Sequence, residues 1–370
     1  MSARFLTVVL ERAFNMRDGF GREIDYMRIS VIDSCNLNCY YCNPCDNNEH
    51  CHALNILSVK EVLCIVRAAT RLGIKHFRLT GGEPLLHPQL DEMVLQIKKI
   101  PGVSSVSLTT NAVLLAQHAM WLKEAGIDSI NVSLDTIDAS EYERITKKPL
   151  LEEVKHGINA AIECGIRVKI NVVLTPQTDV VALTRYVAKK GTDIRFIEMM
   201  PVGEGHTNGV EPYKKVIGTL SKLYGEPCRI NTEKTKEINS GNDKRKIPDN
   251  GPAEYYIFPE LGIRVGLIQA IHGKFCDTCN RIRVTADGRL MPCLGSSVTM
   301  DLVPDSWDFA DDVEKDFAIV RALRAAIKAK PRCHNFNDNA VTYTKTTETK
   351  TTEIEAAEVN AARNMSRIGG

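Results

Sequence analysis

The sequence lacks an excess of charge of either sign and any apolar run long enough to span a membrane. Its 370 residues include 47 Lys plus Arg and 46 Asp plus Glu, giving a formal net charge of +1. This balance argues against a broad nucleic-acid or membrane surface that binds through bulk charge. The apolar stretch at residues 1–10 is too short for a secretory signal and no small-residue cleavage site follows it, so we expect a cytoplasmic protein.

A Walker-type G-x4-G-K-[ST] segment is also absent, which excludes a P-loop as the means of holding a nucleotide. Apolar residues make up 44% and charged residues 25% of the chain, as in ordinary globular proteins. The length fits one large domain or two of average size. A local basic pocket for a phosphorylated small molecule is compatible with this composition.

Cysteine is plentiful, with twelve in the chain, but a disulfide framework is not expected in a cytosolic protein. Six of the cysteines fall in two tight triplets. Cys64 and Cys164 lie in helix-like apolar segments and are expected to pack as small hydrophobes. Cys45 and Cys51, with histidines beside them, are interpreted as loop residues, although an additional metal-binding role is an open alternative.

Alternating strand and helix patterns predict six β–α units between residues 28 and 200. Such alternation implies parallel strands with right-handed crossovers. Six units rather than eight predict an incomplete (βα)6 TIM-like barrel that is open on one side. A capping box at Ser58 and Glu61 starts the first helix, which ends at Gly73. The expected strands are 27–32, 75–80, 103–109, 129–134, 168–174 and 194–198, and the other expected helices are 88–99, 114–125, 151–164 and 179–189.

Chemically unusual residues follow the carboxyl ends of these strands, where barrel enzymes build their sites. They comprise a cysteine loop, Gly81-Gly-Glu-Pro84, Thr109-Thr-Asn111, Ser133-Leu-Asp135, Asn171 and Glu198-Met-Met-Pro201.

The rest of the chain suggests a second region and a tail. Residues 236–252 are polar and rich in structure-breaking residues, and residues 342–353 are a Thr-rich, low-complexity segment. We therefore expect a partial barrel over 1–235, a C-terminal α+β region with substrate-binding residues over 236–340, and a flexible tail over 341–370 that ends in Gly-Gly.

The first cysteine triplet is Cys35, Cys39 and Cys42, with C-x3-C-x2-C spacing. Three thiolates can hold three irons of a cubane iron–sulfur cluster and leave the fourth iron open to a small molecule. Zinc is the alternative, since a nearby cysteine or histidine could supply a fourth ligand.

The second triplet is Cys276, Cys279 and Cys293, with C-x2-C-x13-C spacing. A second cluster with an open iron is the favoured interpretation. A structural zinc with His272 or Cys333 as the fourth ligand is the alternative.

The first triplet together with the Gly-Gly-Glu-Pro segment resembles the radical S-adenosylmethionine (SAM) superfamily. That resemblance implies that the open iron binds the methionine part of SAM, and that one electron releases a 5′-deoxyadenosyl radical. A glycine pair suits such a site because its backbone can approach a ligand closely.

Further motifs extend the resemblance over almost the whole chain to the GTP 3′,8-cyclase family of molybdenum cofactor biosynthesis. They are Asn131-Val-Ser-Leu-Asp135, Arg195-Phe-Ile-Glu-Met-Met200, Asn280-Arg-Ile-Arg283, the second triplet and the terminal Gly-Gly. The resemblance implies a lyase that converts GTP to (8S)-3′,8-cyclo-7,8-dihydroguanosine 5′-triphosphate, the first step of molybdopterin synthesis. The radical would remove the ribose 3′ hydrogen, and the second cluster would bind the purine.

The family motifs imply roles for individual residues. The six triplet cysteines would bind two [4Fe-4S] clusters. SAM contacts would come from Tyr41, Gly82, Ser133 and Met200. GTP contacts would come from Arg28, Arg78, Thr109, Lys169, Arg195, Arg281 and Arg283, of which Arg281 and Arg283 are also expected to act in catalysis, together with Gly369 and Gly370 inserted from the tail.

Elementary chemistry supports an anionic substrate, because the arginine fork grips phosphate oxygens in pairs. Arg281 and Arg283 lie two apart in a strand-like run and so share one face. A pairing of Arg195 with Glu198 is the alternative for that arginine. The implied partners are an electron donor of the flavodoxin or ferredoxin type and a downstream cyclic pyranopterin monophosphate synthase, and a homodimer is an open alternative.

Two other functional classes fit parts of the sequence. One is a different radical SAM enzyme with an auxiliary cluster, such as a peptide-modifying maturase. The other is a zinc-stabilised binding protein without catalysis. Ala112 also departs from the family pattern, which has glycine after Thr-Thr-Asn, and alanine would be strained if the backbone there requires a positive φ.

Overall fold

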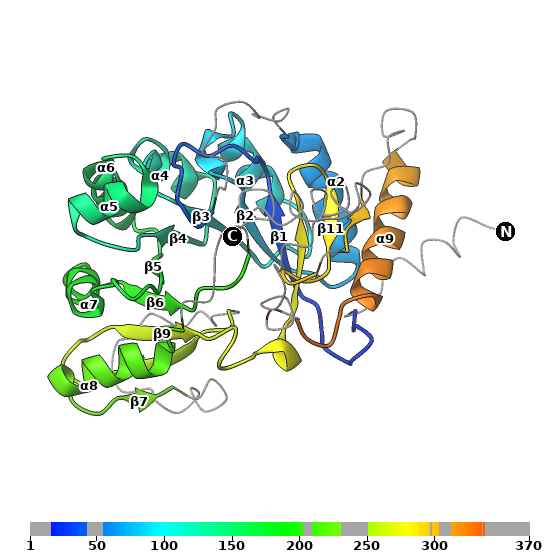
Figure 1. Ribbon diagram of the computed structural model, residues 1–370. Coiled ribbons are helices and arrows are strands. Elements are labelled where there is room, and N and C mark those ends of the chain that lie inside the picture. The colour runs from blue at the N-terminus through cyan, green and yellow to red at the C-terminus, as the bar shows by residue number, and fades with distance from the viewer. Residues whose placement is uncertain are drawn as a thin grey trace, which may run out of the picture.

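The fold is organised by a twelve-stranded sheet in the order β12-β11-β10-β1-β2-β3-β4-β5-β6-β9-β8-β7. This computed structural model describes residues 16–42, 55–202, 209–230, 251–296, 298–302, 312–334 and 336. Strands β1 to β6 are all parallel, and together they curve as an arc that does not close (Figure 1). The six strands are Tyr26–Ser30, His76–Thr80, Ser105–Thr110, Ser129–Ser133, Val168–Val173 and Asp193–Ile197. The predicted incomplete barrel is confirmed.

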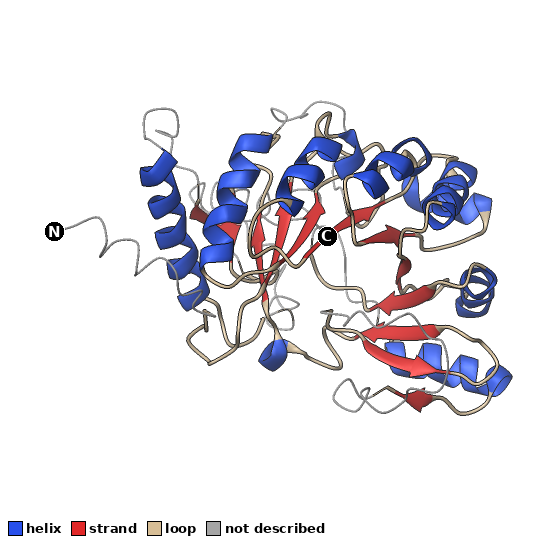
Figure 2. Cartoon of the chain, turned by 180° about the vertical axis from the view of Figure 1, so that it is seen from behind, coloured by secondary structure: helices blue, strands red, loops and turns tan. Residues whose placement is uncertain are grey.

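Helices cover the outer, convex side of this arc (Figure 2). They are α2 Val59–Arg71, α3 Leu90–Lys98, α4 Leu115–Glu124, α5 Ala139–Thr146, α6 Leu151–Glu163 and α7 Val180–Lys189. The predicted capping box is present: the Ser58 hydroxyl accepts from the Glu61 amide at 3.3 Å, and the Glu61 carboxylate accepts from the Ser58 amide at 2.7 Å. Helix α5 was not predicted, although its Asp138 cap, which accepts from the Glu141 amide at 2.8 Å, is a readable start signal.

The C-terminal part of the chain adds a strand to each edge of the parallel sheet. Strand β9 (Arg264–Ile268) is parallel to β6, and β10 (Arg281–Val284) is parallel to β1. Short antiparallel strands then finish both sides: β8 Glu254–Ile257, β7 Cys228–Arg229, β11 Arg289–Met291 and β12 Met300–Asp301. The two regions expected from sequence therefore share one continuous sheet.

The remaining helical elements pack around these edges. A π-helical turn, Tyr213–Ile217, leads into α8 (Gly218–Tyr224), which contacts α7, while α9 (Asp312–Lys328) contacts α2. Two 3-10 turns, Pro84–Leu86 and Cys276–Thr278, lie in loops of the candidate site. No helix in the described part of the chain is long and apolar enough to cross a bilayer.

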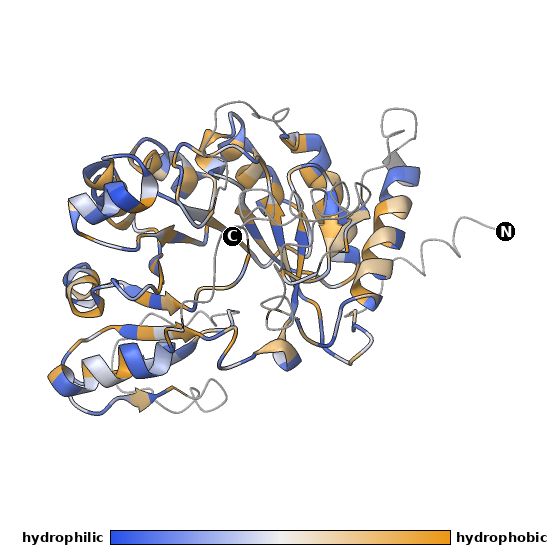
Figure 3. Ribbon diagram, in the orientation of Figure 1, coloured by the Kyte–Doolittle hydropathy of each residue, from blue (hydrophilic) through white to orange (hydrophobic). Residues whose placement is uncertain are grey.

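The parallel strands alternate apolar and polar residues, which is unusual because parallel strands are commonly buried on both faces. Met27 and Ile29 of β1, and Phe77 and Leu79 of β2, are fully buried beneath the helices in the main core. Hydrophilic and hydrophobic residues also alternate along the covering helices (Figure 3). Successive strand side chains point to opposite faces, so the intervening polar residues face the concave side: Arg28, Arg78, Ser107, Asn131, Lys169 and Arg195.

Ala112 adopts the left-handed backbone conformation, with φ of 66°. Its side chain is fully buried, and its amide donates to the Thr110 hydroxyl at 2.9 Å. Lys147 is the other non-glycine residue with positive φ in the described ranges. The sequence-based concern about Ala112 is thereby confirmed, because this conformation favours glycine.

Replacing Ala112→Gly should raise the free energy of unfolding by about 0.5–1 kcal/mol, since it relieves the left-handed strain at a buried turn. Urea unfolding of the cluster-free protein would measure this. Ala160→Gly, within helix α6, is the matched control and should lower stability by about 1 kcal/mol. Equal losses in both variants would show that the backbone at Ala112 is unstrained.

Candidate active site

The first cysteine loop leaves the carboxyl end of β1 and docks on the residues that follow β2. The Gly82 amide donates to the Ile32 carbonyl at 2.8 Å, and the Glu83 amide donates to the Ser34 carbonyl at 2.7 Å. These two bonds fix the chain immediately before Cys35.

Gly81 and Gly82 are required by this docking. A Cβ on Gly82 would lie 2.1 Å from the Ser34 carbonyl oxygen and 2.5 Å from that of Asp33, while one on Gly81 would lie 2.3 Å from the Ile32 oxygen. These are main-chain atoms that cannot move aside without displacing the cysteine loop. The glycine pair therefore has a structural reason besides the close approach of a ligand.

Glu83 is the buried anchor of the neighbouring loops, with 1% of its surface exposed. Its carboxylate accepts from the Thr110 hydroxyl and the Asn111 amide, both at 2.7 Å, and from the Leu85 amide at 3.0 Å. Burial raises the pKa of Glu83 to about 7.

Asn111 continues this network to the cysteines. Its side-chain amide donates to the Asn36 side chain at 2.7 Å and reaches the Cys35 sulfur at 3.7 Å. Thr110 and Asn111, to which the sequence assigned no role, thus connect the ends of β2 and β3 to the first triplet. Their position directly after a predicted strand was the available signal.

The thiols of this triplet lie at the open edge of the sheet. Cys35 is exposed, and Cys39 and Cys42 are partly exposed. A hydrogen bond between the Cys39 and Cys42 side chains, together with burial, raises the pKa of Cys39 well above its usual value. Although Cys35 is exposed as a residue, desolvation of its thiol by the surrounding protein, together with the nearby Glu83, raises the pKa of Cys35 to about 12.

Tyr41, predicted to contact SAM, donates its hydroxyl to the Asp135 carboxylate. Asp135 also accepts from the Val173 amide at 2.7 Å, and burial raises its pKa to about 6. Ser133 is exposed at the end of β4. Met200 packs in a small apolar cluster with Val202, Met291 and Phe336.

Three arginines form a row across adjacent strands. Arg283 of β10 is in register with Arg28 of β1, which is in register with Arg78 of β2. Burial, followed by the charge of Arg283, lowers the pKa of Arg28 well below its usual value. Burial and the charge of Arg281 lower the pKa of Arg283 to about 10. Like charges this close create a strong positive potential that suits an anion.

The pKa of Tyr26 is shifted by the same positive potential. Burial alone would raise the pKa of its phenol, but Arg78 and Arg28 lower it overall. Arg78 donates to the Tyr26 hydroxyl at 2.5 Å, to the Leu108 carbonyl at 3.1 Å and to the Thr109 hydroxyl at 3.3 Å.

Lys169 and Arg195 occupy the same concave face farther along the arc. Lys169 is buried and in register with Asn131, which is itself in register with Thr109. Arg195 is also buried and donates to the Asn171 side chain at 2.9 Å. Its charge contributes, after burial, to lowering the pKa of Arg281. The structure thus places all seven predicted GTP contacts on one face.

The second triplet lies at the opposite end of β10 from the first. Cys276 and Cys279 precede β10, and the Cys279 amide donates to the Cys276 carbonyl at 3.2 Å. Cys293 follows β11, whose Met291 is in register with Arg283. Burial raises the pKa of Cys276, and the nearby Cys293 and Cys279 thiols add to this, although a hydrogen bond from the His334 backbone opposes it.

Glu198 was considered from sequence as a partner for Arg195. In the structure it instead holds the segment at Ile271 and His272, which precedes the second triplet. Its buried carboxylate accepts from the amides of Ile271 at 2.7 Å and His272 at 3.1 Å, and from the His272 ring. A cavity of about 210 Å³ lies beside this segment, lined by Gln269, Lys274, Phe275 and Thr278 among others.

Among the described residues, no three His, Cys, Asp or Glu side chains converge on a point that would hold a single ion. A three-cysteine cubane does not need such convergence, because each thiolate binds a different iron.

Several predicted residues lie outside the described ranges, namely Cys45, Cys51, segment 342–353, Gly369 and Gly370.

Comparison with known proteins identifies the family. Residues 29–182 match the model of the radical SAM superfamily, and residues 192–336 match that of Molybdenum Cofactor Synthesis C. GTP 3′,8-cyclase of Clostridium perfringens (strain SM101 / Type A) is 35% identical over 324 residues, which are 87% of this chain and 95% of that protein. The chain belongs to the GTP 3′,8-cyclase family.

A second relative and a solved structure are also similar to this chain. GTP 3′,8-cyclase of Peptoclostridium acidaminophilum is 37% identical, over 87% of this chain and 94% of its own. Streptococcus suis SuiB bound to S-adenosylmethionine has a similar fold, with a TM-score of 0.53 and 14% identity over 82% of this chain and 68% of SuiB. The SuiB likeness supports the shared fold alone.

Replacing Gly82→Ala should displace the first cysteine loop, because the added methyl group meets main-chain oxygens. We expect SAM cleavage by the reconstituted protein to fall about 100-fold, as a shift of about 1 Å in a reacting group can produce. Release of 5′-deoxyadenosine would be measured. Gly218→Ala, where an added Cβ has no neighbour within 4 Å, is the control and should leave it unchanged. Full activity of the Gly82 variant would contradict the docking role.

The raised pKa of Glu83 makes stability depend on pH. In the unfolded chain this carboxyl ionises near its usual value of 4.5, whereas in the fold it stays protonated to about 7. The native state therefore binds more protons between these values, and stability should fall by up to about 3 kcal/mol as pH rises through that window. Urea unfolding of cluster-free protein from pH 5 to 8 would measure the slope. Glu83→Gln should flatten it, and exposed Glu143→Gln should not.

Proposed function

We propose that this chain binds GTP across the concave face of its sheet and converts it to (8S)-3′,8-cyclo-7,8-dihydroguanosine 5′-triphosphate. The observation that carries the proposal at residue level is the arginine row of β10, β1 and β2. Family membership supplies the reaction class, and the row supplies a place for a triphosphate.

The arginines are suited to phosphate rather than to a structural carboxylate. Arg28, Arg78 and Arg283 face the same side from three neighbouring strands, and their shared environment lowers the pKa values of Arg28 and Arg283. A triphosphate would compensate several of these charges at once, with each guanidinium gripping two oxygens. Lys169 and Arg195 add positive charge on the adjoining strands.

The two triplets lie at opposite ends of the β1–β10 pair. Strand β1 has five residues, so its first and last Cα atoms are about 13 Å apart at the usual rise per residue. This separation allows a nucleotide to lie between the triplets, with its purine toward Cys276, Cys279 and Cys293. In this proposal Arg281, which follows Cys279 by two residues, contacts the nucleotide beside the second triplet.

An iron–sulfur cluster fits the first triplet, because its three thiols share one loop at an open edge and the docked glycines fix that loop. With SAM bound there, the cluster would supply one-electron cleavage of SAM and hence a hydrogen-abstracting radical. Tyr41, Gly82, Ser133 and Met200 are proposed to position SAM, and Asp135 orients Tyr41. We also propose a second [4Fe-4S] cluster on the second triplet.

Other features of the proposal are carried over from the family resemblance. They are insertion of Gly369 and Gly370 into the site, an electron donor of the flavodoxin or ferredoxin type, a downstream cyclic pyranopterin monophosphate synthase, and a cytoplasmic location. The homodimer stays a prediction.

The deciding experiment is anaerobic reconstitution with iron and sulfide, followed by incubation with SAM, dithionite and GTP. The proposed function requires 5′-deoxyadenosine and a cyclised nucleotide, both dependent on GTP. If the rate of 5′-deoxyadenosine release were the same with and without GTP, the assignment of GTP as substrate would be wrong, and a different radical SAM enzyme would be favoured.

Arg283→Gln should raise the apparent KM for GTP by about 10- to 100-fold, because it removes one charge-assisted phosphate grip. Binding of SAM in the absence of GTP should be unchanged, since the first cysteine loop is not altered. Arg289→Gln is the matched control, because Arg289 lies on the neighbouring strand β11, where its exposed side chain pairs with Asp301 at 3.1 Å. An unchanged KM in the Arg283 variant would place the triphosphate elsewhere.

A further inference from the structure

A turn near the start of the described chain reaches the second cysteine loop. Asp18 closes this turn, with its carboxylate accepting from the amides of Phe20 at 2.9 Å and Arg22 at 3.0 Å. The same carboxylate accepts from the Arg22 guanidinium at 2.5 Å, and both side chains are buried. The guanidinium is thereby held in one orientation.

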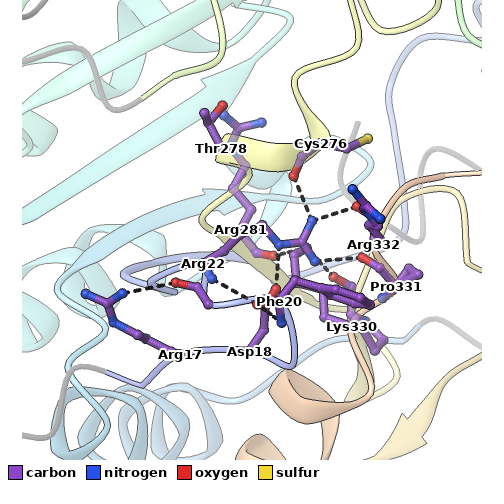
Figure 4. Close-up of polar contacts among 12 residues, drawn as sticks. Arg17, Asp18, Phe20, Arg22, Cys276, Thr278, Arg281, Lys330, Pro331 and Arg332 are labelled. Carbon is purple, nitrogen blue, oxygen red and sulfur yellow. Dashed lines mark hydrogen bonds and ion pairs between the residues drawn. The ribbon is translucent and has the colours of Figure 1, made fainter.

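Arg22 uses its remaining donors on three main-chain carbonyls (Figure 4). It donates to Cys276 at 2.7 Å, to Arg332 at 3.0 Å and to Pro331 at 2.6 Å. These residues lie 254 to 310 positions away in sequence. One side chain therefore joins the amino-terminal turn, the second triplet and the segment after α9.

Lys330 completes the arrangement from the other side. It is 3% exposed, and its ammonium donates to the carbonyls of Arg281 and Pro292, both at 2.8 Å. Among the carbonyls held by the two buried cations, those of residues 276, 281 and 292 belong to a cysteine of the triplet or lie within two residues of one. Loops gain rigidity when buried polar groups of this kind are fully paired.

We propose that Arg22 is a positioning residue for the second cluster. It acts through the Cys276 carbonyl and the 331–332 segment, and with Lys330 it sets the spacing of Cys276, Cys279 and Cys293. Because Asp18 neutralises its charge locally, Arg22 acts by geometry rather than by net charge. The inference rests on the proposed function in so far as the second triplet holds an iron–sulfur cluster.

The test compares Arg22→Gln and Arg22→Lys with Arg17→Gln, whose exposed side chain donates to Gly21 in the same turn. In metal-free protein, hydrogen exchange of the 276–296 amides should become about tenfold faster in both Arg22 variants and stay normal in the control. After reconstitution, iron per chain should fall by about half, with the first cluster retained. Lysine should not rescue, because a single ammonium cannot reproduce the fork.

Iron content and exchange rates that match wild type in Arg22→Gln would overturn the proposal. So would full rescue by Arg22→Lys, since charge alone would then suffice. Binding of SAM without GTP serves as the folding check, because it depends on the first triplet. If wild type itself failed to use GTP, the proposed function would be lost, while the exchange measurement on metal-free protein would still decide whether Arg22 fixes the loop.

Discussion

The concave face of this protein depends on holding like charges side by side in a parallel sheet. Neighbouring strands are about 4.8 Å apart, and two unit charges at that separation repel by up to about 3 kcal/mol at the effective dielectric of a protein surface. Arg283, Arg28 and Arg78 occupy three consecutive strands in register. On the opposite face, Met27, Phe77 and their neighbours pack under the helices. The free energy gained by burying these apolar side chains offsets the repulsion.

An incomplete barrel is compatible with this constraint. A closed eight-stranded barrel fills its interior with apolar side chains, whereas a face lined with arginines needs room for a counter-charged ligand. The C-terminal region then adds β9 and β10 to the two edges instead of closing them on each other. Addition of β10 also brings Arg281 and Arg283 next to Arg28 and carries the second triplet to the far end of the strand pair.

The two cysteine loops are held by different means. The first follows its strand directly and docks by close main-chain contact at Gly81 and Gly82, where no side chain fits. The second lies in the connections between strands. It is held by hydrogen bonds that the buried cations of Arg22 and Lys330 donate to its main-chain carbonyls. Ala112 and Glu83 show that the surroundings of the first loop accept local strain and a buried carboxyl to maintain this geometry.

Local patterns in the sequence determined much of this protein. Strand and helix alternation, the Ser58 capping box and the cysteine spacings depend on neighbouring residues, so the six parallel strands and both triplets could be predicted. The alternation of Arg28 or Arg78 with buried apolar residues also belongs to this local level. Helix α5 was missed because it is short, although Asp138 marks its start.

Only the tertiary structure decided which distant residues meet. The pairing of β10 with β1 creates the arginine row. The backbone hydrogen bonds of this pairing cannot be read from the residue types of either strand. The contacts of Arg22 with residues 276, 331 and 332, and of Glu198 with His272 rather than a neighbour in its own motif, depend on how loops fold back over more than 70 residues. Such contacts are fixed by packing of the whole sheet, which no local pattern encodes.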